Sequence, residues 1–179
     1  MTLPSSAYFD FTPDLRICRL LTGLWQLSGA HGPVDREAAV RAMFDYVDAG
    51  FTTFDLADHY GPAEEVVGEF RRRLAAQRGA QALTGLQAFT KWVPPPARFN
   101  RRAVEGAIAL SRRRMDTPTL DLLQFHWWDY ANSAYLDTLA ELARLRDGGQ
   151  IRHLALTNFD TAHLAGIVES GIRIVSNQV

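Results

Sequence analysis

The chain has 179 residues, of which 47% are apolar and 22% charged, and its formal net charge is −1. This length supports one domain with a sizeable core, so we expect residues 1–179 to form a single domain. The near-zero net charge argues against a general role on nucleic acid or on a membrane surface. Because Cys18 is the only cysteine, an internal disulfide and a cysteine-based zinc site are both excluded.

The chain carries no pattern for export or membrane insertion. Its first residues lack a basic segment followed by an apolar one, so we expect no signal peptide. No apolar run is long enough to span a bilayer. We therefore expect a cytoplasmic protein.

Strand-like and helix-like segments alternate after a polar-rich start, where residues 8–18 predict a hairpin that turns at Pro13 and Asp14. The short apolar runs predict strands over residues 20–25, 51–55, 82–91, 120–126, 151–157 and 172–178. Helical spacing and capping residues predict helices that begin after Asp35, at Glu64, after Asn100, at Ser133 and after Asp160.

Largely apolar strands that alternate with helices indicate a parallel α/β sheet covered by helices. Two folds fit, a doubly wound sheet and a (β/α)8 TIM barrel. The dinucleotide-binding pattern of a doubly wound sheet is absent, because residues 23–29 read GLWQLSG. Polar residues at several strand ends favour the barrel, which places its active site there. An intact barrel needs eight strands and about 250 residues, so we expect a partial barrel of six strands, preceded by the hairpin.

Four polar residues follow successive strands: Asp55, Tyr60, Lys91 and His126. A free phenol has a pKa of about 10 and is a poor proton donor at neutral pH. The ammonium group of Lys91 would lower that pKa, and Asp55 would keep Lys91 protonated and in place. His126 can donate a hydrogen bond to a substrate oxygen. Each residue alone has an ordinary structural explanation, but the four together predict a site that protonates a carbonyl.

The four tryptophans, Trp25, Trp92, Trp127 and Trp128, also fall just after predicted strands. They could form an apolar wall for an aromatic or alicyclic substrate. We expect at least two of them to be packed between helices instead. The histidines show no spacing typical of metal ligands, so we predict no metal.

With these residues in place, the chain resembles the aldo-keto reductases. The similarity begins in the segment GFTTFDLADHYG at residues 50–61 and continues through Glu64, which suggests the branch with a Tyr-Gly-x-x-Glu pattern. It resumes at residues 90–91, in DLLQFHW at 121–127, in residues 149–159 and in SNQ at 176–178. Because four motifs occur in the same order, the resemblance is specific, and it ends after the sixth barrel strand.

The resemblance implies NADPH-dependent reduction of a small aldehyde or ketone, with NADH left open as the cofactor. It makes Tyr60 the proton donor, Lys91 and Asp55 the pair that tunes its pKa, and His126 the residue that orients the substrate. The residues that it places beside the nicotinamide are Gly23, Trp25, Asp55, Thr157, Asn158 and Gln178.

Two other readings stay open. The first is a catalytically incompetent fragment of such an enzyme, which would expose unpaired strand edges and self-associate through them. The second is a non-catalytic regulatory subunit with the same fold, because a fold does not set a function. The residues do not identify the carbonyl substrate, since substrate loops vary most in this fold.

Overall fold

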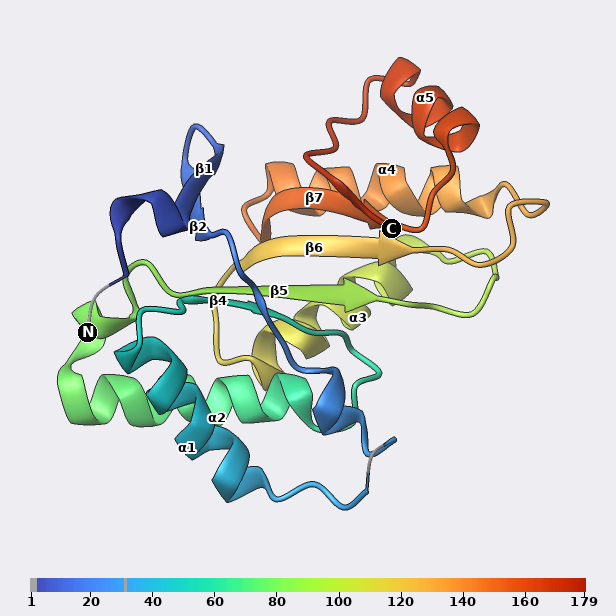
Figure 1. The fold of residues 1–179 in the computed structure, drawn as a ribbon. Coiled ribbons are helices and arrows are strands. Elements are labelled where there is room, and N and C mark those ends of the chain that lie inside the picture. Colours follow the sequence, from blue (N-terminus) through green and yellow to red (C-terminus); the bar gives the residue numbers. More distant parts are fainter. Residues whose placement is uncertain (1–2, 31) are drawn as a thin grey trace. The chain divides into compact units, whose positions relative to one another are not determined.

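The computed structural model describes residues 3–30 and 32–179, which form two compact units. The first unit contains the chain up to Phe89 together with Arg113–Thr117. The second unit contains Thr90–Arg112 and Pro118–Val179. Figure 1 shows the helices and strands, coloured along the chain.

The first unit opens with a short 3-10 helix, η1 (Ser5–Ala7), and the predicted hairpin. Strands β1 (Tyr8–Thr12) and β2 (Leu15–Cys18) pair antiparallel, with Thr12 opposite Leu15, so the chain turns at Pro13 and Asp14 as the sequence indicates. On β2, Leu15, Ile17 and Cys18 are buried while Arg16 is exposed. This alternation fits a strand with one face in the core.

Three parallel strands of the first unit differ in length from the prediction. Strand β3 (Thr22–Gly23) has two residues, and the chain then enters the 3-10 helix η2 (Trp25–Ser28). Strand β4 (Thr53–Asp55) lies between β3 and β5 (Gln87–Trp92). The start of β5 was predicted too early, because residues 80–83 form the 3-10 helix η3 (Ala80–Leu83) and Gly85 has a φ of 85°.

Helices α1 (Arg36–Asp48) and α2 (Ala63–Arg78) lie side by side in the first unit (Figure 1). The Asp35 side chain accepts a hydrogen bond from the Ala38 amide, which confirms the predicted cap of α1. Val40 and Met43 form the buried stripe of this helix. On α2 the buried residues include Val66, Val67, Phe70 and Leu74, which recur at helical spacing.

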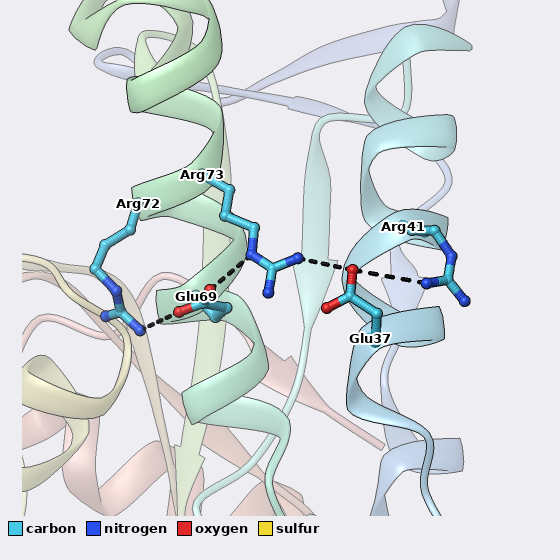
Figure 2. A network of polar contacts seen from close by, with 5 residues as sticks. All are labelled: Glu37, Arg41, Glu69, Arg72 and Arg73. Atoms are coloured by element: carbon cyan, nitrogen blue, oxygen red, sulfur yellow. Dashed lines mark hydrogen bonds and ion pairs between the residues drawn. The ribbon is translucent and has the colours of Figure 1, made fainter.

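Charged side chains connect the outer faces of α1 and α2 (Figure 2). Arg73 donates to Glu69 at 2.6 Å and across to Glu37 on α1 at 2.8 Å. Arg72 donates to the other oxygen of Glu69 at 2.7 Å, and Arg41 lies 3.6 Å from Glu37. These arginines are therefore partnered by carboxylates on the surface, as expected for a helix face in solvent. The hydrogen bond from Arg73 lowers the pKa of Glu37.

The second unit contains the end of β5 and three further parallel strands. Strands β6 (Leu120–His126) and β7 (Ile151–Thr157) have the predicted bounds, and each is buried at all but one position. Strand β8 (Asn177–Gln178) has two residues, fewer than predicted. The helices of this unit are α3 (Arg101–Arg114), whose last two residues belong to the first unit, α4 (Ala134–Asp147) and α5 (Thr161–Glu169). Helix α4 packs along β7 (Figure 1).

The strand order separates the two folds that the sequence left open. The parallel sheet has the order β3-β4-β5-β6-β7-β8, so each strand neighbours the next one in the chain. A doubly wound sheet reverses its strand order at a switch point, whereas a (β/α)8 barrel adds its strands sequentially. The sequential order of six strands therefore confirms a partial (β/α)8 barrel with an additional N-terminal hairpin.

Candidate active site

The first unit brings Gly23 and Asp55 together. They are register partners at the ends of β3 and β4, and the Leu24 amide donates to the Asp55 carbonyl at 2.8 Å. A Cβ atom built on Gly23 would meet no atom within 4 Å, so this glycine lines open space. Because both strands end here, the Asp55 carboxylate lies at the sheet edge where barrel enzymes bind their substrates.

The loop after β4 positions Tyr60. Its amide donates to the Ala57 carbonyl at 3.1 Å, and its carbonyl accepts from the Ala63 amide at 3.0 Å, where α2 begins. The Tyr60 ring is half-buried between two aromatic rings that meet it edge-on. The Trp25 centroid lies 4.9 Å away at 78°, and the His59 centroid lies 4.9 Å away at 75°. These contacts fix the ring of the predicted proton donor.

The electrostatic environment of Tyr60 within its own unit opposes ionisation. Burial raises the pKa of its phenol above 10.0, and the nearby Asp55 carboxylate raises it further. The expected lowering of this pKa relies on Lys91, which belongs to the second unit. Burial and the Asp55 carboxylate therefore favour the protonated form of the phenol.

The second unit holds Lys91 and His126. Lys91 is the penultimate residue of β5 and is 4% exposed, and His126 ends β6 and is 5% exposed. The Asn158 amide nitrogen lies 3.3 Å from Nε2 of His126. An amide nitrogen only donates hydrogen bonds, so in this arrangement Nε2 accepts and the ring proton is on Nδ1.

Thr157, Asn158 and Gln178 come together where β7 and β8 end. Thr157 is the register partner of both His126 and Gln178. The backbone N–H of Asn158 donates to the Gln178 carbonyl at 2.8 Å. The Thr157 side chain is buried, and its hydroxyl oxygen has no hydrogen-bond partner among the residues that the structure describes. A buried hydroxyl of this kind is suited to a polar ligand, which would supply the missing hydrogen bond.

The tryptophans divide into two pairs. Trp92 and Trp127 are buried, as expected for packing residues, and both rings lie against Phe125 at 5.9 and 5.8 Å. Trp25 and Trp128 are 44% and 63% exposed. Trp25 lies on Tyr60 in the first unit, and Trp128 lies 4.0 Å from the His126 ring in the second. The exposed pair therefore flanks two of the predicted catalytic side chains.

Sequence reasoning missed two side chains that lie beside Asn158 in the second unit. The Tyr130 hydroxyl donates to the Asn158 carbonyl at 2.8 Å, and the Asn177 side chain bonds both the amide and the carbonyl of Phe159. Asn177 lies inside the SNQ motif, which could have drawn attention to it. Tyr130 lies in a loop with no motif, and nothing in the sequence pairs it with a residue 28 positions later.

Comparison with known proteins supplies the family. The sequence model of the aldo/keto reductase family matches residues 19–179. The chain belongs to the aldo/keto reductase family. An aldo-keto reductase of Mycobacterium sp. (strain KMS) is 30% identical over 158 residues, which cover 88% of this chain and 52% of that protein. The NADH-specific methylglyoxal reductase of Escherichia coli (strain K12) is 22% identical over 179 residues, covering 89% of this chain and 54% of that protein.

The solved structures of aldo-keto reductases match the fold as well. The aldo/keto reductase from Klebsiella pneumoniae in complex with NADP and acetate is 26% identical, with a TM-score of 0.71 over 89% of this chain and 52% of that one. The chain thus spans about half the length of the relatives that it matches.

The described residues also bear on metal binding and on membrane insertion. Within residues 3–30 and 32–179, no three acidic, histidine or cysteine side chains gather in a way that could hold a metal ion. No helix in the described part of this aldo/keto reductase chain is long and apolar enough to cross a membrane.

Proposed function

We propose that the protein is a nicotinamide-dependent carbonyl reductase that converts an aldehyde or ketone to the alcohol, with NADPH as its preferred hydride donor. The observation that carries this proposal is the polar group at the ends of β6, β7 and β8. There the side-chain amide of Asn158 contacts the buried His126. Beside it lies the buried hydroxyl of Thr157, which has no hydrogen-bond partner among the described residues. Family membership supports the same chemistry.

The donor set fits the carboxamide of a nicotinamide ring. A carboxamide offers two N–H donors and one acceptor oxygen. The Thr157 hydroxyl and the side-chain amides of Asn158 and Gln178 can each donate and accept, so together they can satisfy both ends of this group. When bound there, the nicotinamide supplies the hydride for the carbonyl carbon. A cofactor held in one orientation presents one face of its ring to the substrate.

Two side chains of the protein act on the carbonyl oxygen of the substrate. Tyr60 gives its phenolic proton to this oxygen as the alcohol forms, and His126 donates a hydrogen bond to it through Nε2. For His126 to donate there, the ring proton must be on Nε2, so the amide nitrogen of Asn158 must leave that atom. The family resemblance assigns Lys91 and Asp55 to the tuning of the Tyr60 pKa.

Two relatives guide the choice of cofactor and substrate. The Escherichia coli relative is named an NADH-specific methylglyoxal reductase, whereas the Klebsiella pneumoniae structure contains NADP. We therefore include both reduced cofactors in the test and place methylglyoxal first in a panel of small aldehydes and ketones.

The experiment measures turnover by the purified protein from the absorbance of reduced nicotinamide. We expect oxidation of NADPH with at least one carbonyl of the panel. Tyr60→Phe should lower kcat by about 100-fold or more, since a positioned general acid contributes that much, and should leave the Kd of the cofactor within about twofold. Tyr46→Phe, at a tyrosine of α1 that is 43% exposed, is the matched control and should leave kcat unchanged.

Two results would contradict the proposal. The first is a Tyr60→Phe variant that turns over as fast as the unmodified protein, because the phenol would then not be the proton donor. The second is a protein that binds NADPH or NADH and reduces none of the carbonyls, which would favour a non-catalytic role for the same fold.

A further inference from the structure

Asn158, one of the residues proposed to bind the nicotinamide, has an unusual backbone conformation. Its φ is 61°, in the left-handed region, and only one other non-glycine residue among those described has a positive φ. Asparagine tolerates this conformation better than most residues, but a single left-handed residue persists only when its surroundings hold it. The position of the Asn158 side chain therefore depends on what fixes the two peptide groups beside its Cα atom.

Both of these peptide groups are held by hydrogen bonds. On one side of the Cα atom, the backbone N–H of Asn158 donates to the Gln178 carbonyl at 2.8 Å. The peptide group on the other side is held at both ends. Its carbonyl oxygen accepts from the Tyr130 hydroxyl at 2.8 Å, and its N–H, from Phe159, donates to the Asn177 side chain at 3.2 Å.

Tyr130 is itself anchored by packing. Its ring lies 5.2 Å from the buried Phe159, 4.5 Å from His163 and 6.3 Å from Tyr135, measured between centroids. Burial raises the pKa of the Tyr130 phenol, with a further contribution from the Asp160 carboxylate, so the hydroxyl stays protonated and able to donate. The rings thus aim a permanent donor at the Asn158 carbonyl.

We propose that Tyr130 is a positioning residue. Its hydroxyl fixes the Asn158 backbone and so directs the side-chain amide of Asn158 to His126 and to the cofactor. The part that concerns the cofactor rests on the proposed function, whereas the contact with His126 does not. Without the hydroxyl, one end of the Asn158–Phe159 peptide group is released. The side-chain amide of Asn158 then samples orientations away from Nε2 of His126. In this role Tyr130 acts through Asn158.

The test compares two tyrosine-to-phenylalanine variants of one aromatic cluster. Tyr130→Phe removes the hydroxyl that bonds Asn158 and keeps the ring. Tyr135→Phe is the matched control, because its ring lies 5.8 Å from Phe159 and its hydroxyl makes no recorded hydrogen bond within the described residues. Thermal unfolding checks that both variants fold.

The first measurement is the ¹⁵N chemical shift and pKa of the His126 imidazole by NMR, which needs no cofactor. We expect both quantities to change in Tyr130→Phe and to be unchanged in Tyr135→Phe, because only the former frees the Asn158 amide from Nε2. An unchanged His126 signal in Tyr130→Phe would overturn the inference, whatever the protein catalyses.

The second measurement is the Kd of NADPH and NADH by fluorescence titration. We expect Tyr130→Phe to weaken binding by roughly tenfold, the effect of about one lost hydrogen bond, and Tyr135→Phe to weaken it less than twofold. Equal affinity of the two variants would refute the link to the cofactor. If the unmodified protein binds neither nucleotide, the proposed function fails, while the His126 signal still decides the role of Tyr130.

Discussion

Thr53 provides a direct test of how the hairpin is attached to the parallel strands. It lies on β4 and is fully buried, at 0% exposure. Its hydroxyl oxygen accepts from the Cys18 amide at the end of β2 at 2.9 Å, and the hydroxyl donates to the Gln87 side chain on β5 at 3.2 Å. One oxygen atom therefore satisfies polar groups on two other strands, β2 and β5. Thr53→Val replaces the hydroxyl by a methyl group of similar size and removes both hydrogen bonds.

The expected cost follows from the groups that are left behind. A buried donor or acceptor without a partner costs about 1–3 kcal/mol. The Cys18 amide is buried and should account for most of this cost, while Gln87, whose bond is longer, adds less. We expect Thr53→Val to lower the free energy of unfolding by about 3 kcal/mol. For a chain of this size, that change lowers Tm by roughly 6–12 °C.

Urea and thermal unfolding, followed by circular dichroism, measure this change. Thr53→Ser keeps both hydrogen bonds and loses one buried methyl group, so it should cost only about 1 kcal/mol. Thr138→Val is a control at an equally buried threonine, whose hydroxyl donates to the Ala134 carbonyl in its own helix, and it should also cost about 1 kcal/mol or less. If Thr53→Val and Thr53→Ser are equally stable, the hydroxyl does not hold the hairpin and the reasoning fails.

Two further predictions concern the loop that carries Tyr60. We expect NMR titration to give Tyr60 a pKa above 10.0 and Asp55→Asn to lower it, since burial and the carboxylate both disfavour the phenolate. The stability that the protonated phenol contributes is then complete below pH 10.0 and is lost as pH rises through the folded-state pKa. Gly61 has a φ of 49°, and a Cβ atom there would lie 2.5 Å from the Leu27 carbonyl oxygen, so Gly61→Ala should destabilise the protein by about 2 kcal/mol or more. Gly85→Ala, at a φ of 85° with open space around it, should cost less in the same urea titration, and equal losses would contradict the steric argument.

The sequence predicted the strands best where burial and backbone pairing coincide. Strands β6 and β7 are buried at all but one position each, pair with each other, and have the predicted bounds. The run at residues 20–25 is largely apolar, yet Leu20 is 68% exposed and only Thr22 and Gly23 pair as a strand. An apolar run indicates a preference for burial, but it does not report which backbone groups form a ladder. The late start of β5 has the same cause, because the positive φ of Gly85 ends a 3-10 turn that composition does not reveal.

The candidate site could be predicted as a set of residue types and less well as a set of contacts. His126 was predicted because it follows a buried strand, and Thr157 was predicted from the family resemblance. The register of β6 and β7 places them side by side. The hydrogen bond from Tyr130 to the Asn158 carbonyl joins a loop to a left-handed residue, and neither feature has a periodic signature. Side-chain to backbone bonds of this kind depend on the tertiary fold, so residue spacing alone does not predict them.

The division of the four catalytic candidates between the two units gives the Tyr60 titration a second meaning. Asp55 and Tyr60 belong to the first unit, whereas Lys91 and His126 belong to the second. Burial and the Asp55 carboxylate both raise the pKa of the phenol, so neither of these influences makes Tyr60 a stronger acid. A cation that lowers the pKa must come from elsewhere, and the family resemblance assigns that role to Lys91. Addition of NADPH or NADH to the titrated protein then asks whether cofactor binding lowers the Tyr60 pKa, which is the change that proton donation at neutral pH requires.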